Sequence, residues 1–377
     1  MTLVRKRLHQ LGRVVTGKTP PTARQEFFQG DYLFVTPSDL DYNHYYCRSA
    51  ERTVSEQAKA TLRNQFIPAN AVMFTCIGAT IGKCGIAPSE CLTNQQINSV
   101  IANDECDPKF LYYLFCNSVH IVKGMGGGAA TPIVNKSKFE NIDFLVPPLR
   151  QQQEVGRILS AYDDMIENNR RRISLLEEAA RLLYREWFVH FRFPGHEHVP
   201  LTDGLPDGWE RQTLGSVLTL QRGFDLPVAT RLPGTVPVYG STGIVGAHNV
   251  PKVSFPTIIT GRSGSLGHVC FVDDPCWPLN TALWVKEFNA ASVYFAYYLL
   301  EGMNLKQFNG GASVPTLDRN VVHAANITLP PKLLISLFDE QAATLFAQKK
   351  LLLQQNQQLA QARDLLLPRL MNGKIAV

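Results

Sequence analysis

The stretch Gly127-Gly128-Ala129-Ala130-Thr131-Pro132 returns, slightly changed, as Gly310-Gly311-Ala312-Ser313-Val314-Pro315, 183 residues further along the chain. A pair of prolines follows each copy at the same distance, as Pro147-Pro148 and as Pro330-Pro331, so the offset holds without a gap. Similarity at a fixed offset is the sequence signature of a structural repeat. The chain is therefore predicted to be a tandem duplication of one module.

The correspondence extends to both sides of these stretches. With small gaps upstream, the matched pairs are Val134-Asn135-Lys136 with Leu317-Asp318-Arg319, Leu11-Gly12 with Leu214-Gly215, Gly78 with Gly264, Gly82 with Gly267, and 110–114 with 294–299. Each module has short apolar, strand-like runs, such as 71–75 and 257–260, and one helix-like stretch near 108–123 or 292–306. This mixture predicts an α+β fold.

A long amphipathic segment follows each proline pair, which is a good signal for the start of a helix. In the first segment, apolar residues and one Asn recur at spacings of four and three: Val155, Leu159, Tyr162, Ile166, Asn169, Ile173, Leu176, Ala180, Leu183 and Trp187. In the second, an apolar residue recurs every seven positions: Phe338, Leu345, Leu352, Leu359 and Leu366. These patterns predict a coiled coil, in which a polar Asn fixes the register.

The two segments are expected to pair with each other within the chain. Antiparallel pairing would place two similar modules at opposite ends of a rod of about 57 Å, at 1.5 Å per residue over roughly 38 residues, so that the rod acts as a ruler. The alternative is two unrelated surface helices. The predicted organisation is a first module over 1–148, a long helix over 149–192, a linker and second module over 193–331, and a second long helix over 332–377.

Composition narrows the functional classes. Hydrophobic residues make up 45% of the 377 residues and charged residues 18%, which is typical of a globular protein of two or three domains and excludes disorder or collagen-like structure. No apolar run is long enough for a membrane span and the basic N-terminus lacks the apolar stretch of a secretory signal, so we expect a cytoplasmic protein. The eight cysteines include no CxxC pair, which favours free buried thiols over disulfides or zinc.

Residues 12–19 match the phosphate-loop pattern GxxxxGK[ST]. A phosphate loop needs a helix that begins at its Lys, and here Pro20 and Pro21, which have no amide donor, follow Thr19 directly. Motifs of zinc proteases, serine hydrolases, dinucleotide-binding enzymes and amino-methyltransferases are absent, and His196 and His198 are expected to be exposed linker residues. The sequence favours a binding protein, without catalytic residues or a metal site, over an enzyme.

The order of several motifs resembles that of the specificity subunit of type I restriction-modification enzymes. The resemblance covers essentially the whole chain and rests on the stretches 17–20, 28–32, 35–40, 93–96, 147–153, 183–189, 205–210 with Leu214-Gly215, and 366–375. In this family the modules are target recognition domains. Two stretches depart from the pattern: the second helix start at 330–334 lacks the glutamines of the first, and Gln221-Arg222-Gly223-Phe224 stands where the first module has Gly17-Lys18-Thr19-Pro20.

The resemblance implies a subunit without catalysis or a cofactor of its own. Such a subunit binds a bipartite double-stranded DNA target, one half with each domain, and recruits two DNA methyltransferase subunits that use S-adenosylmethionine. Motor-nuclease subunits, which use ATP and magnesium, join for restriction, and no membrane is involved. The net charge of +5 is small for a protein that neutralises many phosphates, so we expect the methyltransferase subunits to supply further positive charge.

Polar and basic residues on glycine-rich loops are the candidates for DNA contact, because such side chains read base edges and glycine lets the backbone approach phosphate. In the first module they are Lys18, Thr19, Ser38, Thr80, Lys83, Gln95 and Gln96, and in the second Arg222, Tyr239, Ser241, Thr242, Arg262, Ser263 and Ser265. The plainer interpretation is that these are structural turns. Gly126-Gly127-Gly128 and Gly310-Gly311 occur in both modules and are expected to have a shared backbone role.

Two other functions remain open from the sequence. An ATPase that uses residues 12–19 would bind nucleotide as the purified chain. A repeat-built adhesion or scaffold protein would have no affinity for DNA duplexes even with methyltransferase subunits present.

Overall fold

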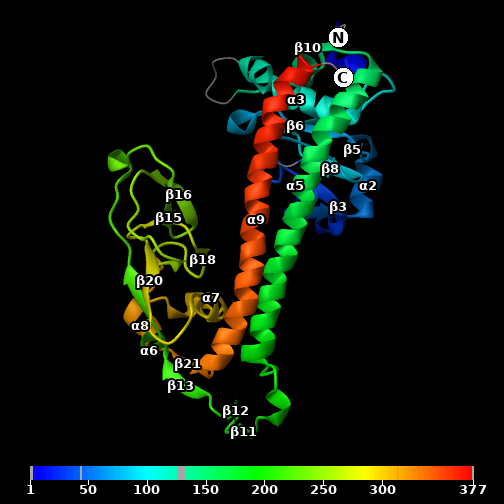
Figure 1. Cartoon of the computed structure of the whole chain (residues 1–377). Helices are drawn as coiled ribbons and strands as arrows, with labels where there is room; N and C mark the ends of the chain where they lie inside the picture. Colours follow the sequence, from blue (N-terminus) through cyan, green and yellow to red (C-terminus); the bar gives the residue numbers. More distant parts are fainter. Residues whose placement is uncertain (1–2, 43–44, 126–131, 312, 376–377) are drawn as a thin grey trace. The chain divides into compact units, whose positions relative to one another are not determined.

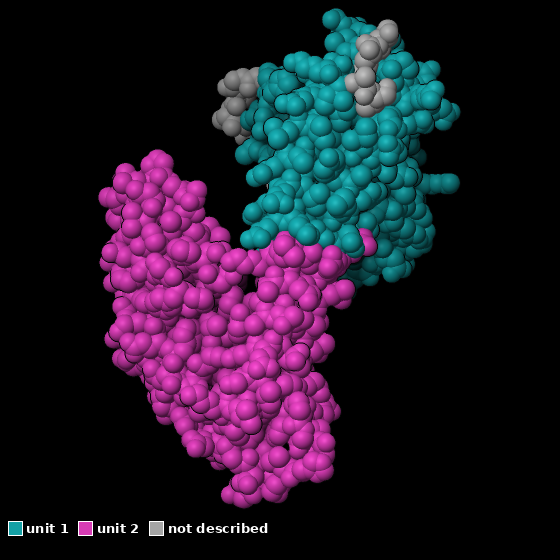
Figure 2. All heavy atoms as spheres, in the orientation of Figure 1, with its two compact units in different colours: residues 1–170, 353–377 teal, residues 171–352 magenta. Residues whose placement is uncertain are grey.

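The computed structural model describes residues 3–42, 45–125, 132–311 and 313–375. The chain divides into two compact units, residues 1–170 with 353–377 and residues 171–352, which Figure 2 shows in different colours. Each unit contains one module of the predicted repeat and a part of each long helix. The first glycine run, Gly126-Gly127-Gly128, lies outside the described residues.

The first unit contains two four-stranded sheets and a two-stranded one. The first sheet has the order β2 (Gly12–Thr16), β9 (Ile97–Ala102), β6 (Val72–Thr75) and β7 (Cys84–Ile86), with antiparallel neighbours. The second has the order β4 (Arg52–Val54), β3 (Phe28–Val35), β8 (Cys91–Thr93) and β5 (Phe66–Ile67), and its β3 and β8 are parallel. The pair β1 (Val4–Arg7) and β10 (Asp143–Val146) is antiparallel.

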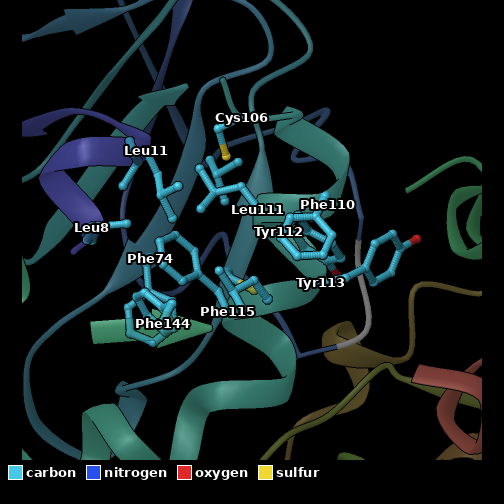
Figure 3. Packing of buried hydrophobic residues seen from close by; sticks show 14 of the residues in the cluster. Leu8, Leu11, Phe74, Cys106, Phe110, Leu111, Tyr112, Tyr113, Phe115 and Phe144 are labelled. Carbon is cyan, nitrogen blue, oxygen red and sulfur yellow. The ribbon is translucent and has the colours of Figure 1, made fainter. Parts of the chain in front are cut away.

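The helices of this module are α1 (Leu8–Leu11), α2 (Glu56–Thr61), α3 (Pro108–Met125) and α4 (Lys136–Glu140). The six residues Phe110–Phe115 of α3 are all buried, and Figure 3 shows five of them, Phe110–Tyr113 and Phe115, packed with Leu8, Leu11, Phe74 and Phe144. The ring centroids of Phe74 and Phe115 are 5.2 Å apart. Burial of such large side chains, each worth about 1.5–3 kcal/mol, is what holds the helix against the sheet.

The second unit repeats this arrangement. Its first sheet has the order β14 (Leu218–Arg222), β20 (Ala282–Phe288), β17 (Thr257–Gly261) and β18 (Val269–Val272), and a second has the order β16 (Gly243–His248), β15 (Val236–Gly240) and β19 (Trp277–Pro278). Two-stranded pairs are formed by β13 (Glu210–Thr213) with β21 (Asn326–Leu329), and by β11 (Leu201–Thr202) with β12 (Leu205–Pro206). The helices are α6 (Leu214–Val217), α7 (Val293–Gly302) and α8 (Arg319–His323).

The duplication predicted from the 183-residue offset is confirmed in detail. The strand order β2-β9-β6-β7 is matched by β14-β20-β17-β18, and the parallel pair β3 with β8 is matched by β15 with β19. Asn135 and Asp318 both cap the first turn of a short helix with their side chains. The amide of Gly78 donates to the carbonyl of Pro132 at 2.8 Å, and the amide of Gly264 to that of Pro315 at 2.9 Å.

The second repeat helix is shorter than the stretch predicted near 292–306. Helix α7 ends at Gly302, and Asn304 adopts a left-handed conformation with φ of 47°, after which Leu305–Phe308 form a 3-10 turn. Glycine and a left-handed Asn are common helix terminators because the αL region does not continue a right-handed helix. The apolar pattern of the sequence therefore continues beyond Gly302, although the helix ends there.

The two long helices are α5 (Leu149–Tyr184), which continues into a π-helical turn over Arg185–Val189, and α9 (Lys332–Met371) (Figure 1). In the first unit, Asn169 Nδ2 donates to Asn356 Oδ1 at 3.0 Å, and Asp163 pairs with Arg363. Residue numbers rise along one helix as they fall along the other, so the predicted antiparallel coiled coil is confirmed. The predicted seam of α5 is buried or half-buried throughout, and Asn169 has a polar partner. Within the described ranges, no helix combines the length and apolar character that crossing a membrane requires.

Candidate nucleic-acid interface

Four strands of the first unit end at one place, and their following loops gather there. Thr16 at the end of β2 pairs with Asn98, and Thr75 at the end of β6 pairs with Ile97, both at the start of β9. The ends of the parallel strands β3 and β8 are joined in the same way, because Val35 pairs with Thr93. The predicted DNA-contacting residues of the first module all lie on these loops or on the turn between β8 and β9.

The structure brings the first-module candidates together in two groups. Thr19 Oγ1 donates to Gln95 Oε1 at 2.7 Å, next to the exposed Lys18. Lys83 Nζ donates to the carbonyl of Pro37 at 3.1 Å, which places it beside the exposed Ser38.

The other two candidates of this module are engaged locally. Thr80 Oγ1 donates to the carbonyl of Ile77 at 2.8 Å, and Gln96 is held by Asn94, whose Oδ1 accepts from the Gln96 amide at 3.1 Å. Both side chains are half-buried. Their contacts are those of residues that shape a turn, whereas Lys18, Ser38 and Gln95 present exposed side chains.

The candidates of the second module surround the equivalent loops. Arg222 Nη2 lies 3.1 Å from Asp225 Oδ1, the same carboxylate accepts from Asn280 Nδ2, and the carbonyl of Asn280 accepts from Arg262 Nη1 at 3.4 Å. This polar chain links two predicted arginines through Asp225 and Asn280, which sequence reasoning missed. A signal for Asn280 was present, because the 185-residue offset between Gly82 and Gly267 places it opposite Gln95.

The remaining second-module candidates differ in exposure. Thr242 and Ser265 are exposed, while Ser241, Ser263 and Tyr239 are half-buried, and the amide of Ser263 donates to the carbonyl of Thr281 at 3.1 Å. The ring of Tyr239 packs on the buried cluster around Trp284, and burial raises the pKa of its hydroxyl to about 12. Tyr239 therefore stays neutral and is mainly a packing residue.

Main-chain hydrogen bonds hold both sets of loops in the same way. The amides of Lys18 and Phe224 donate to the carbonyls of Thr93 and Pro278, each at 2.8 Å. Gly17 and Gly223 precede them, and at either position a Cβ atom would clash with a backbone oxygen of the facing turn. The second module thus retains the glycine of the Gly-x-Thr-Pro stretch at Gly223, a correspondence that the sequence comparison did not find.

The side chains on this common scaffold differ between the modules. Arg262 occupies the position of Cys76: their amides donate to the carbonyls of Thr281 and Gln96, at 2.8 and 2.9 Å, and their carbonyls both accept from the chain after the glycine run. Cys76 is buried, and burial raises the pKa of its thiol to about 12, so it carries no charge. Arg262 is half-buried and positively charged, so the same loop position is apolar in one module and cationic in the other.

A second positive charge beside this loop was also missed. The stem of the exposed Lys306 packs against Gly267, next to the residue His268 that corresponds to Lys83. Lys306 comes from the 3-10 turn that follows α7, where the sequence predicted a continuing helix. No periodic pattern distinguishes it from any other surface lysine.

Glycines of the second run adopt the backbone role expected for them. The amide of Gly310 donates to the carbonyl of Thr316 at 2.9 Å, and a Cβ atom on Gly311 would clash with the carbonyl oxygen of Val314. Both contacts fold the segment back on itself next to the Arg262 loop. The amide of Leu317 donates to the carbonyl of Arg262. The segment therefore supports the loop through backbone hydrogen bonds, and the Asn309 side chain, which accepts from the amides of Gly311 and Thr316, holds the segment in shape.

Residues 2–178 match the model of the "type I restriction modification DNA specificity domain". The chain is 31% identical over 229 residues to the type I restriction enzyme MjaIX specificity subunit of Methanocaldococcus jannaschii, across 59% of this chain and 53% of that one. It is 30% identical over 174 residues to the HindI specificity subunit of Haemophilus influenzae, across 44% and 37%. The matched part thus spans about half the length of the first relative and less of the second.

The fold has a counterpart among solved structures. The S subunit of a type I restriction-modification system from M. genitalium superposes with a TM-score of 0.60 at 17% identity, covering 98% of this chain and 96% of that one. At this identity the likeness concerns the fold alone. Residues 2–178 thus match a type I restriction modification DNA specificity domain, and the chain is similar over part of its length to specificity subunits of type I restriction enzymes.

Proposed function

We propose that the chain recognises a two-part duplex DNA sequence, one half with each recognition domain, and has no catalytic activity of its own. The observation that carries the proposal is that two equivalent loop sites share one backbone scaffold and differ in side chains, as at Cys76 and Arg262. A scaffold of this kind presents polar groups to base edges while its backbone approaches phosphate. Different side chains on equivalent loops select different half-sites.

The proposed partners are two DNA methyltransferase subunits, which use S-adenosylmethionine, and motor-nuclease subunits for restriction. The long helices support this assignment, because both expose apolar side chains, including Leu175, Leu351 and Leu365, that are 54–69% accessible. Apolar groups exposed along a helix pair are typical of a surface that a partner covers. The purified chain is therefore expected to be poorly soluble alone and to form a complex of one copy with two methyltransferase subunits.

Methylation mapping tests the proposed function. The chain would be co-expressed with its methyltransferase subunit, the mass of the complex measured, and the methylated bases in the host DNA sequenced. A two-part, asymmetric methylated sequence that depends on this chain supports the proposal. A stable monomer that ignores the methyltransferase, or methylation without sequence preference, contradicts it.

The phosphate-loop pattern has a different role in the structure. Residues 12–16 form strand β2, and the amides of Gly17 and Lys18 donate to the carbonyls of Ile97 and Thr93 at 3.2 and 2.8 Å. Those amides would have to bind phosphate in a nucleotide site. The pattern is therefore better explained by a backbone clamp, the amides of Gly17 and Lys18 that hold the first recognition loop against β8 and β9.

Replacing Arg262 with Ala is expected to weaken recognition of one half-site. If the guanidinium pairs with a guanine edge, one base position is relaxed at a cost of about 1–3 kcal/mol; if it holds phosphate, all sequences weaken equally and the salt slope falls by about 1. Competition binding of the methyltransferase complex to duplexes with single-base changes, at several salt concentrations, separates the two. Arg211→Ala is the matched control, since this exposed arginine lies on β13, which pairs with β21 and is not part of the sheet that carries the Arg262 loop. Unchanged affinity and slope would show that the loop only supports the fold.

Lengthening the paired helices is expected to lengthen the spacer between half-sites. Seven residues inserted into α5, and seven opposite them in α9, preserve the apolar seam and add about 10 Å. That distance equals about three base pairs, less if rotation of the DNA limits the gain. A single-residue insertion turns the apolar stripe by about 100° and should abolish pairing. Methylation of duplexes with varied spacers is the measurement, and an active insertion variant that keeps the original spacer would contradict the ruler.

A further inference from the structure

Two cysteine side chains of the first unit lie against each other. Cys84 is the first residue of β7, Cys116 lies in α3, and their Sγ atoms are 3.4 Å apart. Sulfur atoms in a disulfide are about 2.05 Å apart, so the two have to approach by only about 1.4 Å. The elements that carry them are otherwise held together by the core in Figure 3. The pair is thus close to bonding geometry while both thiols are reduced.

A cavity gives small molecules access to this pair. It has a volume of about 270 Å³ and is lined by both cysteines together with Tyr113, Val119 and Arg363. Cys84 is buried, whereas Cys116 is half-buried. An oxidant of the size of hydrogen peroxide therefore meets the sulfur of Cys116 first.

The surroundings favour a bond between the two sulfurs over a bound metal. Among the residues that the structure describes, no group of three or more His, Cys, Asp or Glu side chains could hold a metal ion. The hydrogen bond with Cys116 and burial raise the pKa of the Cys84 thiol well above its ordinary value. Cys84 therefore stays protonated at neutral pH and is a poor first nucleophile, so the first attack on an oxidant falls to the more accessible Cys116.

We propose that Cys84 and Cys116 form a reversible disulfide when the protein meets a peroxide. The Cys116 thiol attacks one peroxide oxygen, the O–O bond breaks, and the products are a sulfenic acid and water. The Cys84 sulfur then attacks the Cys116 sulfur, the S–O bond breaks, and a second water leaves with the Cys84 proton. Two thiols are oxidised and one peroxide is reduced, and a thiol reductant restores both cysteines.

The disulfide would act on the loop that precedes Cys84. Gly82 packs so tightly on Val119 of α3 that a Cβ atom there would clash with it, and Lys83 lies between Gly82 and Cys84. Drawing Cys84 toward α3 leaves the Gly82 contact no room to shorten, so the loop with Lys83 has to shift. This consequence rests on the proposed function, in which that loop contacts DNA.

The second unit lacks this device at the equivalent place. Phe74 of β6 and Thr260 of β17 are equivalent, because they pair with Asn98 and Leu283 of the matching strands β9 and β20. Phe74 also pairs with Cys84 and Thr260 with Val269, so Val269 is the equivalent of Cys84. The repeat aligns Cys116 with Glu301, which forms an ion pair with Arg181 at 3.3 Å. Oxidation is therefore expected to affect one half of the DNA target and to spare the other.

Peptide mapping of the full chain tests the disulfide directly. The reduced protein is treated with hydrogen peroxide, quenched, denatured and alkylated, and digested without reductant. We expect a peptide pair linked through Cys84 and Cys116 that dithiothreitol separates and that Cys116→Ser abolishes. Cys270→Ser is the matched control, because Cys270 is also half-buried but its sulfur contacts His268 rather than a thiol. If Cys84 and Cys116 stay open to alkylation, or Cys116 alone is overoxidised, the proposal is wrong.

The effect on DNA is measured separately with the complex of the chain and its methyltransferase subunits. After oxidation, we expect binding of the target to fall about tenfold, which corresponds to about 1.4 kcal/mol, with recovery on reduction and no change in Cys116→Ser. Base changes in the half-site of the second domain should keep their discrimination. If the oxidised complex carries the disulfide but binds the target as tightly as the reduced complex does, the link between the disulfide and DNA recognition is wrong. Absence of DNA binding by the reduced complex would instead overturn the proposed function, while the peptide map still decides the disulfide.

Discussion

Under the proposed function, exchanging residues 200–331 for the second recognition domain of a similar specificity subunit is expected to change one half of the methylated DNA sequence and leave the other half intact. The second unit has its own core, built from β14, β17, β20 and α7, and its own set of loops around Arg262. Specific sites are typically preferred over non-specific DNA by 10³-fold or more, so the preference between the old and new half-sites should reverse by about that factor.

The exchange has to preserve the contacts that join the domain to the long helices. Phe295 and Tyr298 of α7 pack on Tyr184 and Phe338, so the incoming domain should carry aromatic residues at these two positions. Methylated-base sequencing of cells that express the chimera with the same methyltransferase is the measurement. A folded chimera that loses both halves of the target together would show that specificity is not divided between the domains.

Replacing Arg363 with Met will destabilise the first unit by about 3–5 kcal/mol, because it leaves a buried carboxylate without its cation. Asp163 and Arg363 are 3% and 6% exposed, and Asp163 also accepts a hydrogen bond from Tyr113. The double variant Asp163→Leu with Arg363→Met should recover most of the loss, since two apolar residues of similar size can replace a buried pair. Urea unfolding followed by near-ultraviolet circular dichroism measures these changes.

The pH dependence of this loss has a defined sign. Burial, which outweighs the nearby guanidinium, raises the pKa of Asp163 above its ordinary value. A carboxyl whose folded pKa is raised contributes stability that is present below its unfolded pKa of about 3.9 and is lost as the pH rises through the folded pKa. Without Arg363 this rise becomes larger, so the gap between variant and parent should narrow in acid. Arg157→Met, which breaks an exposed pair with Glu154 on α5, is the control and should change little.

The architecture could be predicted from the sequence where a residue pattern recurs along the chain. The offset of 183 residues paired Asn135 with Asp318, and both turned out to cap equivalent helices. The spacing of three and four residues predicted the buried seam of α5, including Asn169. Such patterns are visible in a single sequence because positions with similar surroundings in the fold carry similar residues.

The candidate site followed only in part. Glycine-rich loops pointed to Arg262, and the repeat places Asn280 opposite Gln95. The contacts that join Asp225 and Asn280 to Arg262 span 18 to 55 residues, however, and leave no periodic trace. The buried pair of Asp163 with Arg363 and the thiol contact of Cys84 with Cys116 are of the same kind. A sequence shows what a residue can do chemically, whereas its neighbours across the fold depend on how the whole chain packs.

The backbone clamp at Gly17 and Gly223 bears on how such a protein can change over generations. Part of the loop framework is held by amide and carbonyl groups, which every residue type except proline supplies in full, so this part does not depend on the side chains. Under the proposed function, substitutions of exposed loop side chains such as Lys18 and Thr242 are expected to alter the preferred bases at little cost in folding free energy. Under the proposed function, a change of DNA target therefore needs only such exposed positions to vary, whereas any residue with a Cβ atom at Gly17 or Gly223 would displace the loop backbone itself.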